Sequence, residues 1–439
     1  HIIMMKKNRT IYFLLALVCL GLQSCLFQEE DYFDDSSANR ATADVKRCSE
    51  LLEAAPNGWV MEYYVGKDYS LGGITLLCKF DGQRVTMASQ IAGADETVSS
   101  LYSVKSEQAT MLSFDTYNYL VHYFGQPQGS MADDPNGTLG GDYEFVISDA
   151  TADRIELKGK KYGNRIVMKA FSADQTWKQY LTRIKKVEDD AFFYEYDLRM
   201  DGLYTGQMLR SNYTFIVTYY DEVGKVYQKT VPFMFTTDGM RFHEPVTIDG
   251  QTMQNFVWKN EEISFVCTDE GATGVKMKGI YIDGYQSYDY YPGTYLMDFY
   301  RLNGATNQLE VASQEIQLVK NEDGKSYWLK GLEYDILVTY DKPRGGLSIL
   351  PQFLKKVQGG YVYLAMWDLM NDYVLRSSAI GLISYPTTDG IYLVDNGVWM
   401  GEISGFIFGV YDSQDEEASF MGYTDAVAAI RLIKKTIEE

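Results

Sequence analysis

Histidine and cysteine are scarce in this chain of 439 residues, which contains 3 histidines and 5 cysteines. His122 and His243 are the histidines beyond the first residue, and neither lies at a spacing typical of metal ligands or of a histidine-based triad. Cys48, Cys78 and Cys267 are too widely separated for a zinc motif. We expect them to be small buried side chains, with one disulfide as an alternative in an oxidising compartment. The sequence therefore predicts neither a metal site nor a cofactor.

Several other features are missing, and each excludes a class of function. There is no nucleophile elbow of the Gly-x-Ser-x-Gly type and no glycine-rich phosphate loop. There is no basic run, and the formal net charge is −20. Such an acidic chain repels phosphate backbones, so we expect no nucleic-acid partner. Beyond the N-terminal segment, no apolar stretch approaches the length of a membrane span.

The N-terminal segment has the pattern of a bacterial lipoprotein signal. Lys6, Lys7 and Arg9 form a positive region, and residues 11–22 form a short apolar region that ends at Leu22-Gln23-Ser24-Cys25. This apolar region suits a secretory signal and is too short for a comfortable membrane span. We therefore predict a signal peptide at residues 1–24 and lipidation of Cys25, which would anchor the protein to a membrane.

An acidic tether follows the predicted anchor. Residues 25–36 include Gln28-Glu29-Glu30-Asp31 and then Asp34-Asp35. Similar acidic patches direct lipoproteins of Bacteroidota to the outer leaflet of the outer membrane. We accordingly expect an outer-membrane lipoprotein of the cell envelope that is exposed at the cell surface, with a solvated leader as the alternative.

The rest of the chain is patterned as strands. Tyrosine is abundant, with 36 residues, and it favours half-buried pleated surfaces. Asn-Gly or Asp-Gly occurs eleven times, and such pairs favour tight hairpins. We predict strands at Trp59–Val65, Ile74–Phe80, Tyr143–Ile147, Ile166–Ala170, Val231–Phe235, Ile263–Cys267, Tyr295–Tyr300, Tyr361–Trp367 and Phe406–Tyr411. The expected fold is mainly β, with several antiparallel sandwich or barrel-like (calycin-like) domains.

Two helices interrupt this pattern. Apolar residues at spacings of three and four predict the first from Ser36 or Ser37 to the Pro56-Asn57-Gly58 stop. The second is predicted at 175–187, where Trp177, Ile184 and Val187 repeat at helical spacing.

These elements suggest a division of the chain after the tether. We predict an N-terminal helix plus β domain at 37–188, and a C-terminal β domain at 281–439. Residues 189–280 between them form a middle β domain or an extension of the first.

Four segments resemble one family of lipoproteins from gut and oral Bacteroidota, known as domain of unknown function 4302. They are Asn57-Gly58-Trp59, Ser113-Phe114-Asp115-Thr116-Tyr117-Asn118, Gly140-Gly141-Asp142-Tyr143-Glu144-Phe145 and Leu157-Lys158-Gly159-Lys160-Lys161. The resemblance covers most of the chain and is densest from about residue 45 to 190. It implies a lipid-anchored protein without an assigned activity. It also implies an association with outer-membrane importers of nutrients, and it supplies no catalytic residues.

The best candidates for ligand contact are Tyr285, Tyr288, Tyr290 and Tyr291, which cluster with Gln, Ser and Asp in a predicted loop. Their rings could stack on a sugar or a peptide, with packing between domains as the alternative. Paired carboxylates are the other candidates, because glycosidases act with two of them. Asp115, Asp142 and Glu144 lie in the family segments, but ordering a turn explains Asp115 better, and flanking a strand explains Asp142 and Glu144 better.

These observations favour a lipid-anchored surface protein that binds a nutrient, such as a glycan or a peptide, and assists an outer-membrane importer without chemistry of its own. Its expected partners are the membrane, through the anchor at Cys25, the importer complex and the nutrient. Two alternatives remain open. One is a carboxylate-based hydrolase whose acids are not recognisable, and the other is an adhesin or structural subunit of a surface assembly.

Overall fold

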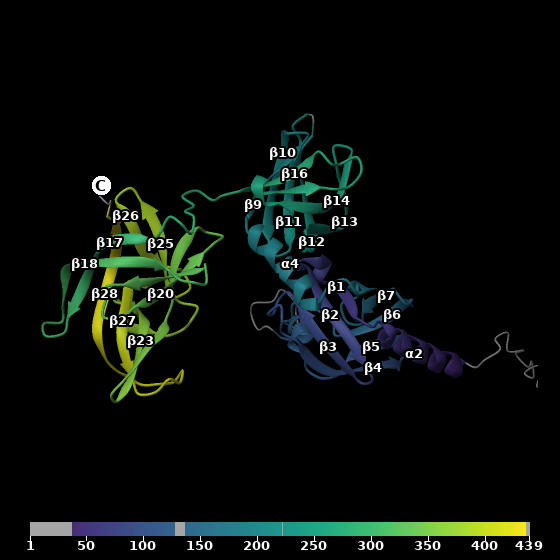
Figure 1. Ribbon diagram of the computed structural model, residues 1–439, viewed down its shortest axis with the longest axis horizontal. Helices are drawn as coiled ribbons and strands as arrows, with labels where there is room; N and C mark the ends of the chain where they lie inside the picture. The colour runs from purple at the N-terminus through teal and green to yellow at the C-terminus, as the bar shows by residue number, and fades with distance from the viewer. Residues whose placement is uncertain (1–36, 128–136, 222, 436–439) are drawn as a thin grey trace, which may run out of the picture. The chain divides into compact units, whose positions relative to one another are not determined.

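The structure is a computed structural model, and it describes residues 37–127, 137–221 and 223–435. The described chain is mainly β, as the sequence predicts, and its strands are joined almost throughout as antiparallel neighbours (Figure 1). The predicted lipidation site at Cys25 lies outside the described residues. Among the helices that are described, none is long and apolar enough to cross a membrane.

The first eight strands form a closed barrel in which each strand pairs with the next one along the chain. The strands are β1 (Trp59–Val65), β2 (Gly72–Asp81), β3 (Arg84–Ser89), β4 (Val98–Ser106), β5 (Thr110–Phe114), β6 (Glu144–Ala150), β7 (Arg154–Gly159) and β8 (Arg165–Ala170). β1 also pairs with β8, which closes the ring. Trp59, Met61 and Tyr63 alternate along β1 into the core, as a period of two requires.

The predicted N-terminal helix is confirmed as α2 (Ser37–Ala54). Its apolar stripe ends in Cys48 and Leu52, which are buried in the core of the first barrel. The Trp59 indole Nε1 donates to the carbonyl of Leu52 at 2.9 Å, so the first strand is joined to the last turn of the helix. Between β5 and β6 lie the short helix α3 (Tyr119–His122) and the 3₁₀ turn η3 (Tyr123–Gly125), and η2 (Lys67–Tyr69) follows β1.

The second predicted helix is also confirmed, as α4 (Trp177–Asp190), which begins and ends slightly later than expected. The shift has a local cause. The Thr176 hydroxyl accepts from the backbone N–H of Gln179, and the Gln179 side chain accepts from the N–H of Thr176. This reciprocal cap sets the start of the helix at Trp177.

A second closed barrel of eight strands follows α4. Its strands are β9 (Glu195–Met200), β10 (Leu203–Ser211), β11 (Thr214–Tyr220), β12 (Val226–Phe235), β13 (Gly239–Ile248), β14 (Gln251–Lys259), β15 (Ser264–Cys267) and β16 (Val275–Ile280), with the turn η5 (Asn260–Glu262) between β14 and β15. β16 pairs with β9 and closes the ring.

The C-terminal part is a sheet of twelve strands. The strands are β17 (Gly293–Asn303), β18 (Gln308–Lys320), β19 (Ser326–Lys330), β20 (Ile336–Asp341), β21 (Gly346–Ile349), β22 (Gln352–Val357), β23 (Gly360–Asp368), β24 (Tyr373–Leu375), β25 (Leu382–Thr387), β26 (Gly390–Asp395), β27 (Gly405–Tyr411) and β28 (Phe420–Lys434). Because β17 also pairs with β28, the strands β17 to β21, β25, β26 and β28 close into a third ring of eight.

The four remaining strands extend this third barrel sideways. The long strand β28 pairs with β26 near its end and with β27 along its first half. β27 pairs in turn with β23, and β23 carries β22 and β24 along its other edge. The barrel and its extension share one core, in which Tyr295 and Phe408 are buried. The extension thus holds a sheet whose far side faces away from that core.

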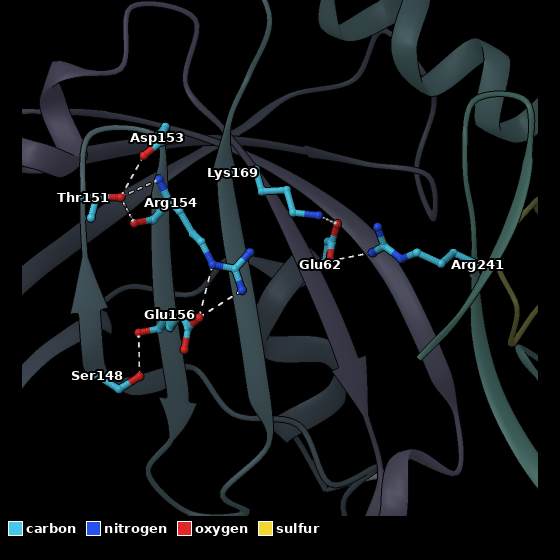
Figure 2. A network of polar contacts seen from close by, with 8 residues as sticks. All are labelled: Glu62, Ser148, Thr151, Asp153, Arg154, Glu156, Lys169 and Arg241. Carbon is cyan, nitrogen blue, oxygen red and sulfur yellow. Dashed lines mark hydrogen bonds and ion pairs between the residues drawn. The ribbon is translucent and has the colours of Figure 1, made fainter. Parts of the chain in front are cut away.

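The chain divides into two compact units, and the first of them is discontinuous. Its described part combines residues up to Val187 with 212–214 and Val231–Val246, which include most of the β12–β13 hairpin. Within this unit the Glu62 carboxylate of β1 lies 2.6 Å from Arg241 of β13 and 2.7 Å from Lys169 of β8 (Figure 2). We call these three residues the charged clamp.

Glu62 and Arg241 of the clamp are largely shielded from solvent, whereas the Lys169 side chain is 43% exposed. The Glu62 side chain is 14% exposed and that of Arg241 is 24% exposed. Burial raises the pKa of Glu62, but hydrogen bonds and charge from Arg241 and Lys169 outweigh it and hold the pKa below its ordinary value. The His243 ring lies nearby, with its centroid 4.2 Å from that of Tyr64.

The three described cysteines, Cys48, Cys78 and Cys267, are free and buried. They behave as small core side chains, and burial raises the pKa of each thiol. The domain boundaries predicted at 188 and 280 stay predictions.

Candidate functional site

The predicted tyrosine cluster lies in the segment that leads into the third barrel. Tyr291 is fully buried, and its hydroxyl donates to the carbonyl of Gly345 at 2.8 Å. The hydroxyl of Tyr288 donates to the carbonyl of Ser326 at 2.8 Å, and its ring stacks on a neighbouring tyrosine, Tyr327. Both residues are thus engaged in holding this segment against the barrel core.

Of the other two members of the cluster, Tyr285 is half-buried and Tyr290 is exposed. The Tyr285 hydroxyl lies 3.1 Å from that of Tyr340. Tyr290 is 39% exposed, and the Lys434 ammonium lies 5.0 Å from its ring centroid. A ligand could reach Tyr290 without any rearrangement, whereas contact with Tyr291 would require its core packing to open. The ligand-binding role of these four tyrosines stays a prediction.

The three candidate carboxylates have separate surroundings. Asp142 is buried, and its carboxylate accepts from the backbone N–H groups of Lys161 at 2.7 Å and Tyr162 at 3.2 Å. Burial raises its pKa, although these hydrogen bonds oppose the change. Glu144 forms ion pairs with Lys105 and Lys160, at 3.0 and 3.3 Å. Asp142 therefore orders a turn and Glu144 belongs to a surface charge network, while the side chain of Asp115 is exposed.

A stronger candidate for ligand contact lies on the sheet that extends the third barrel. In an antiparallel sheet, directly opposed residues lie on the same face. Phe353 of β22 pairs with Tyr363 of β23, and Tyr361 pairs with Tyr411 of β27. β28 begins beside them, with Phe420 opposite Tyr411 and Tyr423 opposite Gly409. We call this surface the aromatic face, and its members are Phe353, Tyr361, Tyr363, Tyr411, Phe420 and Tyr423.

The other side of the same strands is an ordinary core. Val362 and Leu364 alternate with the tyrosines of β23 and are buried in the third core. An antiparallel sheet with one covered side usually presents polar residues on its open side. Here Phe353 is 45% exposed and Phe420 is 44% exposed. Tyr423 is 36% exposed, Tyr361 and Tyr363 are half-buried, and Tyr411 is buried. The aromatic face is therefore a partly exposed aromatic patch, and exposed apolar patches mark binding surfaces.

The rings of the aromatic face form a connected series across the four strands. The centroid of Phe353 lies 5.4 Å from that of Tyr363, which lies 5.7 Å from Tyr411. Tyr411 lies 5.5 Å from Phe420. Neighbouring strands are ~4.8 Å apart, so the series spans ~14 Å from β22 to β28.

Gly409 makes this arrangement of rings possible. A Cβ atom at this position would lie 2.9 Å from the Tyr411 ring and 3.0 Å from the Phe420 ring. The first separation is shorter than real Cβ atoms show, and the second is tighter than nearly all of their contacts. The absence of a side chain at Gly409 lets the two rings lie over the backbone between Tyr363 and Tyr423.

An arginine also belongs to the aromatic face. The guanidinium of Arg376, which follows β24, lies 4.2 Å from the Tyr411 ring centroid and 4.8 Å from that of Tyr363. Its Nη2 donates to the backbone carbonyls of Asp415 and Glu416. Arg376 therefore holds the loop between β27 and β28 beside the rings. An arginine has five N–H donors, so others are left for a ligand.

The described part of the chain also contains two cavities beside tryptophan side chains. The first, of about 500 Å³, is lined by Trp328, Lys330, Glu333, Tyr334, Asp335, Leu354 and Lys355, and we call it the Trp328 cavity. The second, of about 580 Å³, lies beside the start of α4 and is lined by residues that include Lys79, Asp174 and Trp177. Residues 37–127, 137–221 and 223–435 contain no cluster of three His, Cys, Asp or Glu side chains placed to hold a metal ion.

The aromatic face was not identified from the sequence, although one signal was present. The segment Tyr361-Val362-Tyr363-Leu364 is apolar at every position. In a strand with one solvent-facing side, apolar residues normally alternate with polar ones. The segment therefore predicts a strand with apolar groups on both sides. The sequence around Phe353 gives no such indication, because the nearby Lys355 and Lys356 are typical of a polar edge strand.

Known structures resemble the chain weakly. A crystal structure of a protein of unknown function from the DUF3598 family of Nostoc punctiforme PCC 73102 is 7% identical and covers 56% of this chain and 99% of its own, with a TM-score of 0.15. Intact Ap-TbpB, with its N and C lobes, is 11% identical and covers 83% of this chain and 67% of its own, with a TM-score of 0.14. A mutant of the vaccine antigen transferrin binding protein B from Haemophilus parasuis Hp5 gives the same identity and coverage, with a TM-score of 0.12. At these scores, none of the three supports an inference about fold or function.

Family models are more informative. No curated protein matches the chain. Residues 268–407 match a second domain of unknown function, DUF4987. This range includes most of the third barrel and its extension. Residues 29–260 match the domain of unknown function DUF4302. This range includes the whole first barrel and most of the second. More than half of the chain lies within this match, and the chain belongs to the DUF4302 family.

Proposed function

We propose that this protein binds a glycan on the aromatic face and presents it to an outer-membrane importer, without chemistry of its own. In this proposal the chain is a lipoprotein of the cell envelope, anchored through Cys25 and exposed at the cell surface. The aromatic face is the observation that carries the proposal, since Phe353, Phe420 and Tyr423 are exposed on a sheet whose other side is already covered by the barrel core, although Tyr411 itself is buried.

The chemistry of the aromatic face suits a sugar ring. The face of an aromatic ring carries partial negative charge, and the C–H groups on the face of a pyranose carry partial positive charge. Stacking of the two would leave the sugar hydroxyls at the periphery. There Arg376, beside Tyr363 and Tyr411, could donate hydrogen bonds to them.

Charge and shape favour a neutral glycan over other ligands. The chain has a formal net charge of −20, which repels strongly anionic polymers and leaves a neutral sugar unaffected. A peptide usually places side chains into separate pockets or adds a strand to an open edge. The rings between Phe353 and Phe420 instead form one connected series of edge-to-face contacts on a single side of the sheet, and peptide binding is an outcome that the test below can detect.

Replacing Phe353 and Tyr363 together with alanine should weaken glycan binding about 10- to 100-fold, because each lost ring removes on the order of 1 kcal/mol of stacking. The measurement is isothermal titration of the chain from Leu26 onward with starch, xylan, galacturonan and mucin glycans. A panel of peptides is titrated in parallel. Loss of glycan affinity with an unchanged melting temperature is the expected result.

Tyr385→Ala is the matched control, because Tyr385 is 62% exposed on β25, outside the aromatic face. It should leave the affinity unchanged. Equal weakening by Tyr385→Ala and by the double variant would contradict a role for the aromatic face. Binding to peptides alone would replace the glycan in this proposal.

The proposed anchor has its own test. Cys25→Ala should abolish incorporation of labelled palmitate and release the protein from membranes, since several acyl chains are needed for stable anchoring. Cys19→Ala, within the predicted signal peptide, is the control and should keep the label. Palmitate labelling that persists in Cys25→Ala would rule out this anchor.

A further inference from the structure

A second feature of the third barrel lies directly beside the aromatic face. Strand β22 contributes Phe353 to the aromatic face and the next two residues, Leu354 and Lys355, to the Trp328 cavity. The two surfaces therefore adjoin the same strand. The cavity is not explained by the function proposed above, which uses the aromatic face alone.

The position of β22 between the two surfaces is fixed by an unusual contact. The Gln352 side chain accepts from the backbone N–H of Leu337 at 2.8 Å and donates to its carbonyl at 2.9 Å. It thus bonds to β20 as a neighbouring strand would. Leu337 is also the residue opposite Trp328 in the β19–β20 pair. The cavity and the aromatic face are consequently held at a constant separation.

The lining of the Trp328 cavity suits an uncharged, hydroxyl-rich group. The Trp328 ring is 36% exposed and offers a stacking surface. Lys330 and Lys355 can donate to hydroxyl oxygens, and Glu333 and Asp335 can accept from hydroxyl protons. The two positive charges balance the two negative ones, and Lys330 already pairs with Asp335 at 3.7 Å. A strongly charged ligand would therefore gain little here.

The size of the cavity agrees with this chemistry. Small-molecule sites occupy roughly 300–1,000 Å³, and this cavity measures about 500 Å³. A sugar unit with its face on Trp328 and its hydroxyls between the two lysines and the two carboxylates would occupy it.

We infer that the Trp328 cavity is a second sugar-binding subsite, and that the protein holds a long neutral polysaccharide chain across β22 at both the cavity and the aromatic face. This inference rests on the function proposed above and specifies its ligand as a polymer. Binding at a second, rigidly placed point is an intramolecular event, so it adds affinity only for chains long enough to span β22.

The test compares chain lengths. Ladders of maltooligosaccharides and xylooligosaccharides, from disaccharides to long chains, are titrated into the wild type and into Trp328→Ala, Trp328→Phe and the Phe353, Tyr363 double alanine variant. In the wild type, long chains should bind about 10- to 100-fold more tightly than short ones. Trp328→Ala should remove most of this gain, while Trp328→Phe should restore part of the gain because it keeps a ring.

The outcomes separate this inference from the proposed function. Two results would contradict the second subsite: glycan binding that is independent of chain length, or a gain in affinity with chain length that persists in Trp328→Ala. Neither result would contradict glycan binding on the aromatic face. No binding by any ladder or polysaccharide overturns both. A fluorescence difference between the wild type and Trp328→Phe on addition of long chains would place the sugar at Trp328 itself. Tyr385→Ala serves again as the control for exposed aromatic side chains.

Discussion

Replacement of Glu62 by alanine should lower the free energy of unfolding of the first unit by about 2–3 kcal/mol, which lies between the small contribution of an exposed ion pair and the cost of leaving a fully buried charge without its partner. Glu62 bridges Arg241 and Lys169 in the charged clamp, and Arg241 is 24% exposed. Without the carboxylate, the Arg241 guanidinium would keep its shielded position and lose its nearest counter-charge. The β12–β13 hairpin would then be held to the first barrel by fewer interactions.

The effect can be measured by hydrogen exchange of the β1 and β8 amides together with denaturant unfolding. Glu156→Ala is the matched control, because Glu156 pairs with Arg154 at 2.9 Å on the same barrel with both side chains more than 40% exposed (Figure 2). Exposed pairs contribute about 0–1 kcal/mol. A loss for Glu62→Ala no larger than that for Glu156→Ala would show that the clamp does not stabilise the unit.

The clamp also predicts how stability depends on pH. The pKa of Glu62 is lower in the folded chain than its ordinary value of 4.5, so the folded state binds this proton less readily than the unfolded state. Its contribution is complete above pH 4.5 and is lost as the pH falls through the lower folded-state pKa. Burial likewise lowers the pKa of His243 from 6.5, so its contribution begins to decline below that pH. Other carboxyl groups of this unit, such as Asp44 and Glu107, also have lowered pKa values. Glu62→Gln should therefore reduce the loss of stability below pH 4.5 without abolishing it, and leave the decline below pH 6.5 in place.

Replacement of Gly405 by alanine should destabilise the third barrel by about 3 kcal/mol or more, because overpacking between paired backbones cannot be relieved by rotating a side chain. A Cβ atom at Gly405 would lie 1.9 Å from the carbonyl oxygen of Val427 and 2.7 Å from the α-carbon of Ala428. β27 would have to move away from β28 at the centre of the extended sheet. Since β27 carries Gly409 and Tyr411, glycan binding should weaken as well.

Gly304→Ala is the matched control in the same barrel. A Cβ atom there would meet nothing nearer than the Tyr423 hydroxyl at 3.9 Å, which is an ordinary van der Waals separation. Its melting temperature should stay within a few degrees of the wild type, whereas Gly405→Ala should lower the transition of the third barrel clearly. A Gly405→Ala protein as stable as Gly304→Ala would mean that the β27–β28 pairing adapts without cost.

Local patterns in the sequence predicted the elements of this fold well. The stretch Trp59–Val65 was predicted as a strand and is β1 with the same bounds. The helix stop at Pro56-Asn57-Gly58 also agrees with the structure, where α2 ends at Ala54. Such features depend on neighbouring residues, which is why periodicity and turn chemistry identify them.

Features that depend on distant residues were not predicted. Closure of the third barrel needs β17 to pair with β28, so Tyr295 lies opposite Lys434 although 139 residues separate them in the sequence. The aromatic face likewise combines Phe353 with Phe420 through three strand pairings that no local pattern specifies. Tyr291 shows the reverse case, in which a tyrosine-rich segment has the composition of a binding loop and yet is packed in a core.

The discontinuous first unit has a consequence for the order in which this protein can be made. Residues up to Val187 form the first barrel and most of α4, but the unit also requires Arg241 and the rest of Val231–Val246. A chain that emerges from a ribosome or a translocation channel starts with its N-terminus, and domains normally fold in that order. In this protein, Glu62 has no Arg241 to pair with while the first 187 residues are made. The first unit is complete only after 59 further residues, at Val246. During that interval all eight strands of the first barrel are present but the first unit is incomplete, and it is the stage at which a chaperone would be of most use.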